Sequence, residues 1–363
     1  MTSTFAQSAP HLSALRALES APRRVIVKEV NWLGDLVMSL PALRAIRREF
    51  SQAHLAVLVK KELASFFDGA SWIDEVIPYV VRGGLAGIFD RRRTVGEVRS
   101  RSFDLAILFP RSFESAFWMT MARVPRRAGF VADARGAMLT HRAVAPPAAM
   151  AKHQVHYWLS MIHETLGISG DAGDYAVDVH EANRDRMREW LGAHRKAPRS
   201  RLIAIAPAAA YGPAKEWPAE NYGALIDLLA ERYDADCVLV GAPSERARCE
   251  DVVRASRIDA AVAAGETTIG ELIAMLSLSD AFIGNDSGCM HLAGALGIPT
   301  VAIFGSTNPD RTGPLGPRTR VIYHRLECSP CLARTCRFGH YNCLRQVVPG
   351  EVADALLALN KPA

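Results

Sequence analysis

Residues 282–292 read FIGNDSGCMHL, an apolar run that turns polar at Asn285, Asp286 and Ser287 and then continues in helix-like form past Gly288 and His291. Apolar residues normally carry a buried strand to its end, so polar residues here mark either a plain turn or a binding site. Both interpretations place a strand directly before a helix, which is the repeating unit of an α/β fold.

Short apolar runs rich in Val, Ile and Leu recur along the chain and predict buried parallel strands. They alternate with helix-patterned segments, which favours parallel sheets covered by helices on both faces. The predicted strands are 24–30, 55–59, 104–109, 202–206, 237–240, 281–283 and 300–304, and the predicted helices include 36–50, 222–232, 269–278 and 290–296.

The alternation starts twice, near Arg24 and near Arg201, with a polar stretch from about 167 to 200 that ends in HRKAPRS. We therefore predict two Rossmann-like domains, residues 23–185 and 186–363, after an N-terminal extension of residues 1–22. Two such domains place the carboxyl ends of both sheets around one cleft, where open α/β sheets bind ligands.

Length and composition agree with this organisation. A chain of 363 residues exceeds the roughly 100–200 residues of one domain, and its 49% hydrophobic and 22% charged residues are ordinary for a globular protein. No apolar run reaches the roughly 18–20 residues of a membrane-spanning helix, and the first residues lack the apolar core of a signal peptide. We expect a cytoplasmic protein.

The net charge is only +5, from 43 Lys plus Arg against 38 Asp plus Glu, but the basic residues cluster. Such clusters suit a phosphate, a carboxylate or a membrane headgroup, and equally suit solvated helix faces. The clusters are Arg23–Arg24, Arg44 with Arg47 and Arg48, Arg91–Arg93 with Arg99 and Arg101, and Arg126–Arg127.

A carboxylate follows the first predicted strand, in Asn31-Trp32-Leu33-Gly34-Asp35. Asp35 stands at a helix start, where it can cap exposed N–H groups. It can also act as a general base that takes a proton from an attacking hydroxyl.

Two predicted strands in the second half of the chain are followed by loops that carry an ionisable residue. Lys215 lies in AAAYGPAKEWP, where a lysine among small residues can clamp a diphosphate, although the spacing is not that of a P-loop. Glu245 follows CVLVG and can bind ribose hydroxyls, as acidic residues after a Rossmann strand do. Taken singly, each can also be an exposed surface residue.

In the opening stretch, the amides of Ser287 and Gly288 at a helix start can bind an anion. His291 follows one turn later and faces the same way. Four such loops after four strands indicate one site.

Four of the seven cysteines follow the pattern C-x2-C-x4-C-x6-C at Cys328, Cys331, Cys336 and Cys343. A CxxC pair with further cysteines resembles zinc-ligand spacing, yet this spacing departs from paired CxxC knuckles. Both a bound metal and reduced structural cysteines therefore stay open.

Taken together, these segments resemble glycosyltransferase family 9, the bacterial lipopolysaccharide heptosyltransferases, and within it the heptosyltransferase II branch. The likeness runs over roughly residues 24 to 350. It rests on NWLGDLVMSLPALRAI, LFPRSFESA, RRAGF, AYGPAKEWPAENY, GELIAMLSLSDAF and, above all, NDSGCMHLAGALGIPTVAIFGSTNPDRTGPLG.

The resemblance implies a GT-B fold and inverting transfer of heptose from ADP-L-glycero-D-manno-heptose to the first heptose of the lipopolysaccharide inner core. The N-terminal domain would bind the acceptor and the C-terminal domain the ADP-sugar, with no cofactor or metal required. The site residues that it implies are Asp35 as catalytic base, Lys215 at the donor diphosphate, and Glu245, Thr267, Thr268, Asp286, Ser287, Gly288 and His291 around the donor.

The implied acceptor is an anionic lipid-linked core, so we expect peripheral contact with the cytoplasmic face of the inner membrane and no nucleic-acid partner. Basic residues of the first half are the expected acceptor contacts: Arg82, Arg111, Ser112, Arg126 and Arg127.

Three alternative functions share parts of this pattern. A nicotinamide-dependent oxidoreductase shares the alternation, but no G-x-G-x-x-G follows the first strand. A heptosyltransferase I or III, or a family 9 enzyme with another sugar or acceptor, would carry the same donor motifs. A non-catalytic nucleotide-sugar binder is disfavoured by Asp35 beside a full donor set.

Overall fold

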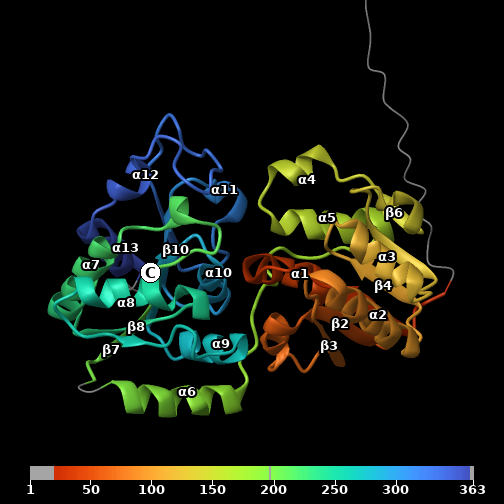
Figure 1. Cartoon of the computed structure of the whole chain (residues 1–363), viewed down its shortest axis with the longest axis horizontal. Helices are drawn as coiled ribbons and strands as arrows, with labels where there is room; N and C mark the ends of the chain where they lie inside the picture. Colours follow the sequence, from red (N-terminus) through yellow and green to blue (C-terminus); the bar gives the residue numbers. More distant parts are fainter. Residues whose placement is uncertain (1–19, 196–197, 360–363) are drawn as a thin grey trace, which may run out of the picture.

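The structure is a computed structural model that describes residues 20–195 and 198–359. It contains two domains side by side, each built on a six-stranded parallel sheet (Figure 1). The predicted α/β class with two Rossmann-like domains is thereby confirmed. Most of the expected N-terminal extension, residues 1–19, lies outside the described residues.

The N-terminal domain has the strand order β3-β2-β1-β4-β5-β6, with all neighbours parallel. Its strands are β1 (Arg24–Lys28), β2 (His54–Lys60), β3 (Glu75–Tyr79), β4 (Leu105–Leu108), β5 (Arg126–Phe130) and β6 (His141–Ala143). Its helices are α1 (Leu33–Glu49), α2 (Gly84–Ser100), α3 (Phe113–Met121), α4 (Pro147–Ala151) and α5 (Val155–Leu166), with 3-10 helices η1 (Lys61–Phe67) and η2 (Arg135–Met138).

The C-terminal domain has the order β12-β11-β10-β7-β8-β9, again all parallel. Its strands are β7 (Arg201–Ala206), β8 (Ala235–Leu239), β9 (Ala261–Val262), β10 (Ala281–Asn285), β11 (Thr300–Phe304) and β12 (Thr319–Tyr323). The helices from here on are α6 (Glu181–His194), α7 (Ala219–Tyr233), α8 (Arg246–Ala255), α9 (Ile269–Ser277), α10 (Gly288–Ala295), α11 (Pro309–Thr312), α12 (Asn342–Arg345) and α13 (Pro349–Leu359), with η3 (Pro213–Lys215) and η4 (Pro243–Glu245).

Each central strand buries both faces, because its side chains alternate between two layers of helices. In β1, Val25 and Val27 pack on the inner side with α1 and α5, while Ile26 packs on the outer side with α2 and α3. The same alternation in β7 separates an inner layer containing α9 and α10 from an outer layer containing α7, α8 and α13. This two-sided burial explains why these strands read as unbroken apolar runs.

Five strands were not predicted from sequence: β3, β5, β6, β9 and β12. They stand at or next to the edges of the two sheets, where burial on both faces is not required. Accordingly β3 contains Pro78, which an edge strand tolerates because one side of it makes no ladder bonds. Two arginines open β5, and β9 spans only two residues.

The connection between the domains passes near residue 180. Arg44 of α1 donates hydrogen bonds to Ala176 and Asp178, so the chain still lies on the N-terminal domain there. Helix α6 then packs on α9 of the C-terminal domain. The boundary expected between residues 185 and 186 would cut α6, whereas a boundary ahead of Glu181 keeps the helix whole.

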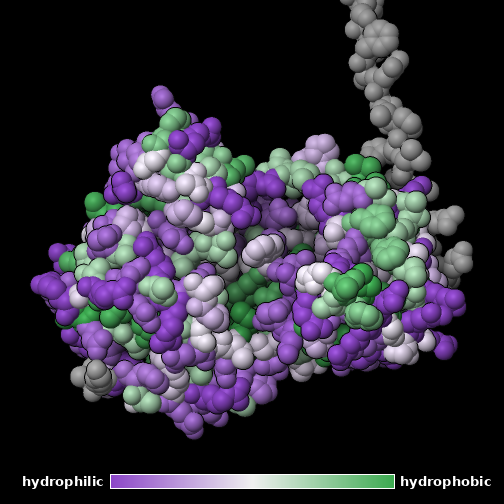
Figure 2. Space-filling model, in the orientation of Figure 1, coloured by the Kyte–Doolittle hydropathy of each residue, from purple (hydrophilic) through white to green (hydrophobic). Residues whose placement is uncertain are grey.

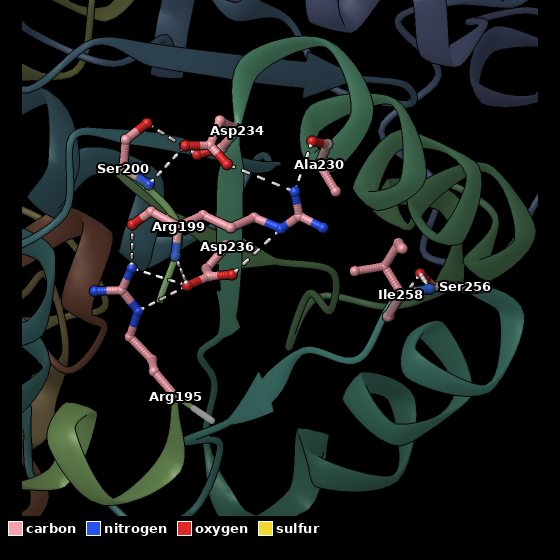
Figure 3. Close-up of polar contacts among 8 residues, drawn as sticks. All are labelled: Arg195, Arg199, Ser200, Ala230, Asp234, Asp236, Ser256 and Ile258. Atoms are coloured by element: carbon pink, nitrogen blue, oxygen red, sulfur yellow. Dashed lines mark hydrogen bonds and ion pairs between the residues drawn. The ribbon is translucent and has the colours of Figure 1, made fainter. Parts of the chain in front are cut away.

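The segment from α6 to β7 is pinned to the amino end of β8 by charge-assisted hydrogen bonds (Figure 3). Asp236 accepts from Arg195 Nε and from the Arg199 backbone N–H, both at 2.9 Å. Asp234 accepts from the Ser200 backbone N–H at 3.1 Å. The end of the predicted linker stretch HRKAPRS therefore belongs to the C-terminal domain.

The domains meet where α1 and α10 pack against each other. A Cβ at Gly34 would lie 2.9 Å from Cδ2 of His291, and a Cβ at Gly288 would lie 2.8 Å from Cβ of Leu33. Real Cβ contacts are not this close, so both glycines are required by close approach. The inner core is accordingly continuous from β1 and α1 through α10 to β10 and β11.

Candidate active site

The strand order reverses at β1 and β4 in one sheet and at β7 and β10 in the other. Ligands of open α/β sheets bind beyond the carboxyl ends of strands at such a switch point. Asp35 follows β1, and Asp286 follows β10. The surface is hollowed between the two domains (Figure 2), so the two switch points face a shared cleft.

Lys215 and Asp286 form an ion pair on the side of the cleft that the C-terminal domain provides. Lys215 Nζ lies 2.5 Å from Asp286 Oδ2, with side chains only 13% and 5% exposed. Thr307 Oγ1 donates to the same oxygen at 2.6 Å. The ammonium also lies 4.8 Å from the centroid of the Tyr211 ring. The lysine is thus held in place rather than free at the surface.

The loop that carries Lys215 is tied to the end of β10 by Asn285, which is fully buried. Asn285 Oδ1 accepts from the Trp217 backbone N–H at 3.1 Å and from Tyr222 OH at 3.0 Å, while its Nδ2 donates to Pro207 O at 2.8 Å. The side-chain amide is satisfied on both ends, so it fixes this loop relative to β10.

The start of α10 leaves hydrogen-bonding capacity unused. Ser287 is the N-cap residue, but its side chain makes no cap bond, and its buried Oγ has no partner among the described residues. Unpaired N–H groups and the helix dipole at such an end attract anions. The donor diphosphate predicted here would therefore meet Lys215 and α10 together.

His291 is buried against Gly34, and its Nδ1 has no hydrogen-bond partner within the described part of the chain. Burial lowers the pKa of His291 to about 4, although Asp286 acts in the opposite direction. The imidazole is therefore neutral at pH 7, and it contributes shape rather than positive charge to the cleft.

Asp35 lies in the first turn of α1, across the cleft from Lys215. The N-cap of this helix is Trp32, with no side-chain cap bond, and among the described residues none donates a hydrogen bond to the Asp35 carboxylate. Burial raises the pKa of Asp35 to about 6, and the charge of Lys215 opposes that rise. A carboxylate left without a capping role and with a raised pKa is suited to take a proton.

The other residues expected to bind the donor follow β8 and β9. Glu245 Oε2 accepts from the Ala242 backbone N–H at 2.7 Å, and burial raises the pKa of its carboxyl. Thr268 caps α9 in a capping box with Glu271, so its hydroxyl is already engaged, and Thr267 precedes it. These positions share the carboxyl edge of the sheet with Lys215.

The expected acceptor residues divide into two groups. Arg82 follows β3, and Arg111 and Ser112 follow β4, so these three lie at the carboxyl edge. Arg82 is paired with Asp90, and Ser112 is the N-cap of α3. Arg126 and Arg127 instead open β5 at the opposite edge of the sheet. Their guanidinium groups bind backbone carbonyls of Asp104 and Met138, so the structure does not bring them to the cleft.

Sequence reasoning missed a buried arginine at the carboxyl edge of the N-terminal sheet. Arg135 donates to Phe130 O at 2.9 Å and to Ser115 Oγ at 3.1 Å, and its Nη2 has no described partner. Burial lowers the pKa of Arg135 to about 10, so it still carries charge at pH 7. Thr307 was missed, and Asn285 was noted at the strand end without a positioning role, because only burial in the fold distinguishes them from ordinary turn residues.

Residues 91–342 match the sequence-family model of glycosyltransferase family 9 (heptosyltransferase). The chain belongs to glycosyltransferase family 9. Among curated proteins it is similar to lipopolysaccharide heptosyltransferase 2 of Escherichia coli strain K12, with 27% identity over 93% of this chain and 98% of that protein.

Solved structures agree with this membership and with the expected GT-B architecture. The ADP-heptose lipopolysaccharide heptosyltransferase II of E. coli superposes with a TM-score of 0.79, 26% identity, and coverage of 93% of this chain and 98% of that one. A family 9 glycosyltransferase from Veillonella parvula has a TM-score of 0.83 at 23% identity, covering 95% and 99%, which supports the fold. Within residues 20–195 and 198–359, no helix is both long and apolar enough to cross a bilayer.

The burial of the Lys215–Asp286 pair generates a stability prediction. Asp286→Asn leaves an ammonium buried without its counter-charge, and removing one partner of a buried pair costs about 3–5 kcal/mol in the free energy of unfolding. The double variant Lys215→Met with Asp286→Asn should lose less than Asp286→Asn alone. Urea unfolding of the wild type, the two single variants and the double variant measures this, and a double variant that loses the sum of the two single losses would show that the pair is not coupled.

Proposed function

We propose that this chain transfers a heptose from ADP-L-glycero-D-manno-heptose to the first heptose of the lipopolysaccharide inner core. The observation that carries the proposal is the opposed placement of Asp35 and the Lys215–Asp286 pair at the two switch points of a family 9 enzyme. One side offers a base for an acceptor hydroxyl, and the other offers positive charge for a diphosphate.

In the proposed reaction, Asp35 accepts the proton of the acceptor hydroxyl. At the same time the oxygen of that hydroxyl bonds to the anomeric carbon of the heptose. The bond from that carbon to the ADP phosphate breaks on the opposite face, so the anomeric centre inverts. Negative charge grows on the departing phosphate, and Lys215 with the N–H groups at the start of α10 stabilises it most as the bond breaks. These protein groups supply the charge that the step needs.

The donor residues Glu245, Thr267 and Thr268 support the nucleoside end of this arrangement, since they lie at the same sheet edge as Lys215. On the acceptor side, Arg111 and Ser112 border the N-terminal switch point. We propose these as contacts for the anionic core, and the buried charge of Arg135 strengthens the positive potential there.

A transfer assay tests the function. The purified chain, with ADP-heptose, should add one heptose mass to a lipid A–Kdo acceptor that already carries one heptose. Preference for the acceptor that ends in Kdo would assign the chain to the enzymes that add the first heptose. No transfer to either acceptor would reject the proposal.

The pH profile and one substitution test Asp35. Because the base must be ionised, kcat/KM should fall as the pH drops through about 6. Asp35→Asn should lower turnover by about 10²–10⁴-fold, the usual contribution of a general base, and leave ADP affinity nearly unchanged. Glu49→Gln, at the exposed far end of the same helix, is the matched control. An Asp35→Asn variant with wild-type turnover would exclude a catalytic role.

We also propose that the N-terminal domain contacts an anionic membrane through α2 and α3. These neighbouring helices expose Leu85 (76%), Phe89 (67%) and Phe117 (43%), and Figure 2 shows apolar patches over their side of the molecule. The exposed Arg92 and Arg93 flank the apolar side chains on α2. Apolar residues edged by arginines suit a bilayer surface that carries negative headgroups.

Sedimentation with vesicles tests this contact. Burying one Leu or Phe side chain is worth about 1.5–3 kcal/mol, so Leu85→Asp with Phe89→Asp should weaken binding to phosphatidylglycerol vesicles by about tenfold or more. Val348→Asp, at an exposed valine of the other domain, should bind like the wild type. Equal binding of all three proteins would locate the membrane contact elsewhere.

A further inference from the structure

A long stretch without helix or strand, residues 324–341, connects β12 to α12 and is seen as the blue loop above the C-terminal domain in Figure 1. Loops longer than roughly 12–15 residues are uncommon in compact domains unless something holds them or they serve a function. This loop carries Cys328, Cys331 and Cys336, and Cys343 follows in α12.

The loop supports the segment that presents Lys215. The Ala214 backbone N–H donates to Arg334 O at 3.0 Å, and Tyr211 OH donates to Leu332 O at 2.6 Å. A Cβ at Gly212 would lie 2.7 Å from Arg334 O, so the two backbones are in close contact. The position of Lys215 therefore depends on an ordered loop.

The four cysteines line one small cavity beneath this loop, together with Ala214 and Ser306. The cavity has a volume of about 20 Å³, room for roughly one water-sized particle. All four are free thiols rather than disulfides. The size suits a single ion and excludes an organic ligand.

The four sulfurs lie near one another at this cavity. Backbone N–H groups of the turn at residues 338–341 point to the sulfur of Cys336, and Cys328, Cys331 and Cys336 all lie close enough to Cys343 to act on it electrostatically. Thiolates brought this close repel each other unless a cation lies between them.

We propose that Cys328, Cys331, Cys336 and Cys343 bind one Zn²⁺ ion, as a structural site that orders the loop behind Lys215. Four thiolates are the ligand set of closed structural zinc sites. His340 lines the same cavity, but its Nδ1 accepts from the Asn342 backbone N–H at 3.0 Å. The four sulfurs remain as the ligands.

To bind one ion together, the four thiols must turn toward the centre of the cavity. In the described residues, no three His, Cys, Asp or Glu side chains already form a metal-binding set. Rotation of cysteine between its staggered χ1 positions moves the sulfur without moving the backbone. Metal binding would then add stability to the loop, because such sites form together with the fold around them.

Metal content and a Co²⁺ titration test the site. Protein purified without chelators should contain about one equivalent of Zn²⁺, measured by mass spectrometry of the metal. The metal-stripped wild type should bind Co²⁺ with the visible absorption of a tetrahedral thiolate complex. Cys331→Ser and Cys336→Ser should each lose most of the zinc, whereas Cys237→Ala should keep it, because Cys237 lies in β8 and does not line the cavity.

Failure would be unambiguous, since the Co²⁺ measurement uses the folded wild type and does not depend on the variants. Little zinc together with no thiolate absorption, or octahedral Co²⁺ absorption without sulfur ligands, would overturn the proposal. The result is independent of the proposed transfer reaction. Zinc binding without heptose transfer would support the zinc site and reject the proposed function. Heptose transfer without zinc binding would support the proposed function and reject the zinc site.

Discussion

The active-site geometry depends on the close contact between the first turns of α1 and α10. Gly34 against His291 and Gly288 against Leu33 allow two helix starts from different domains to meet without a gap. Because each helix follows a central strand at a switch point, this contact also sets the separation of Asp35 from Lys215. A side chain at either glycine would push Asp35 away from Lys215.

Both burial and ion pairing determine the charges of the ionisable side chains near this contact. Lys215 is fixed by Asp286, which is itself held by Thr307, so the position of the ammonium group is set by the protein alone. His291 is kept neutral and adds no competing charge. Asp35 has no such partner, and its raised pKa records the lack of solvent around it. Preorganised charge of this kind lowers the cost of moving charge during a reaction.

The central strands of both sheets were predicted from the sequence, and the strands that were missed lie at or next to the sheet edges. The central strands were found because burial on both faces demands an unbroken apolar run, a requirement that edge strands such as β3 and β5 escape. Missing β5 had a consequence for the site. Without knowing that Arg126 opens a strand, one cannot see that it faces away from the cleft. Residues such as Thr307 and Arg135 were missed because their importance comes from burial by distant segments, which no local pattern records.

The continuous inner core has a consequence for biosynthesis. The N-terminal domain emerges from the ribosome first, with β1 and α1 complete, but the partner of α1 in α10 is made only after most of the chain. Until then the inner face of α1 near Gly34 lacks its cover. The first domain can thus form its sheet early, yet it reaches its final packing only when the second domain folds against it.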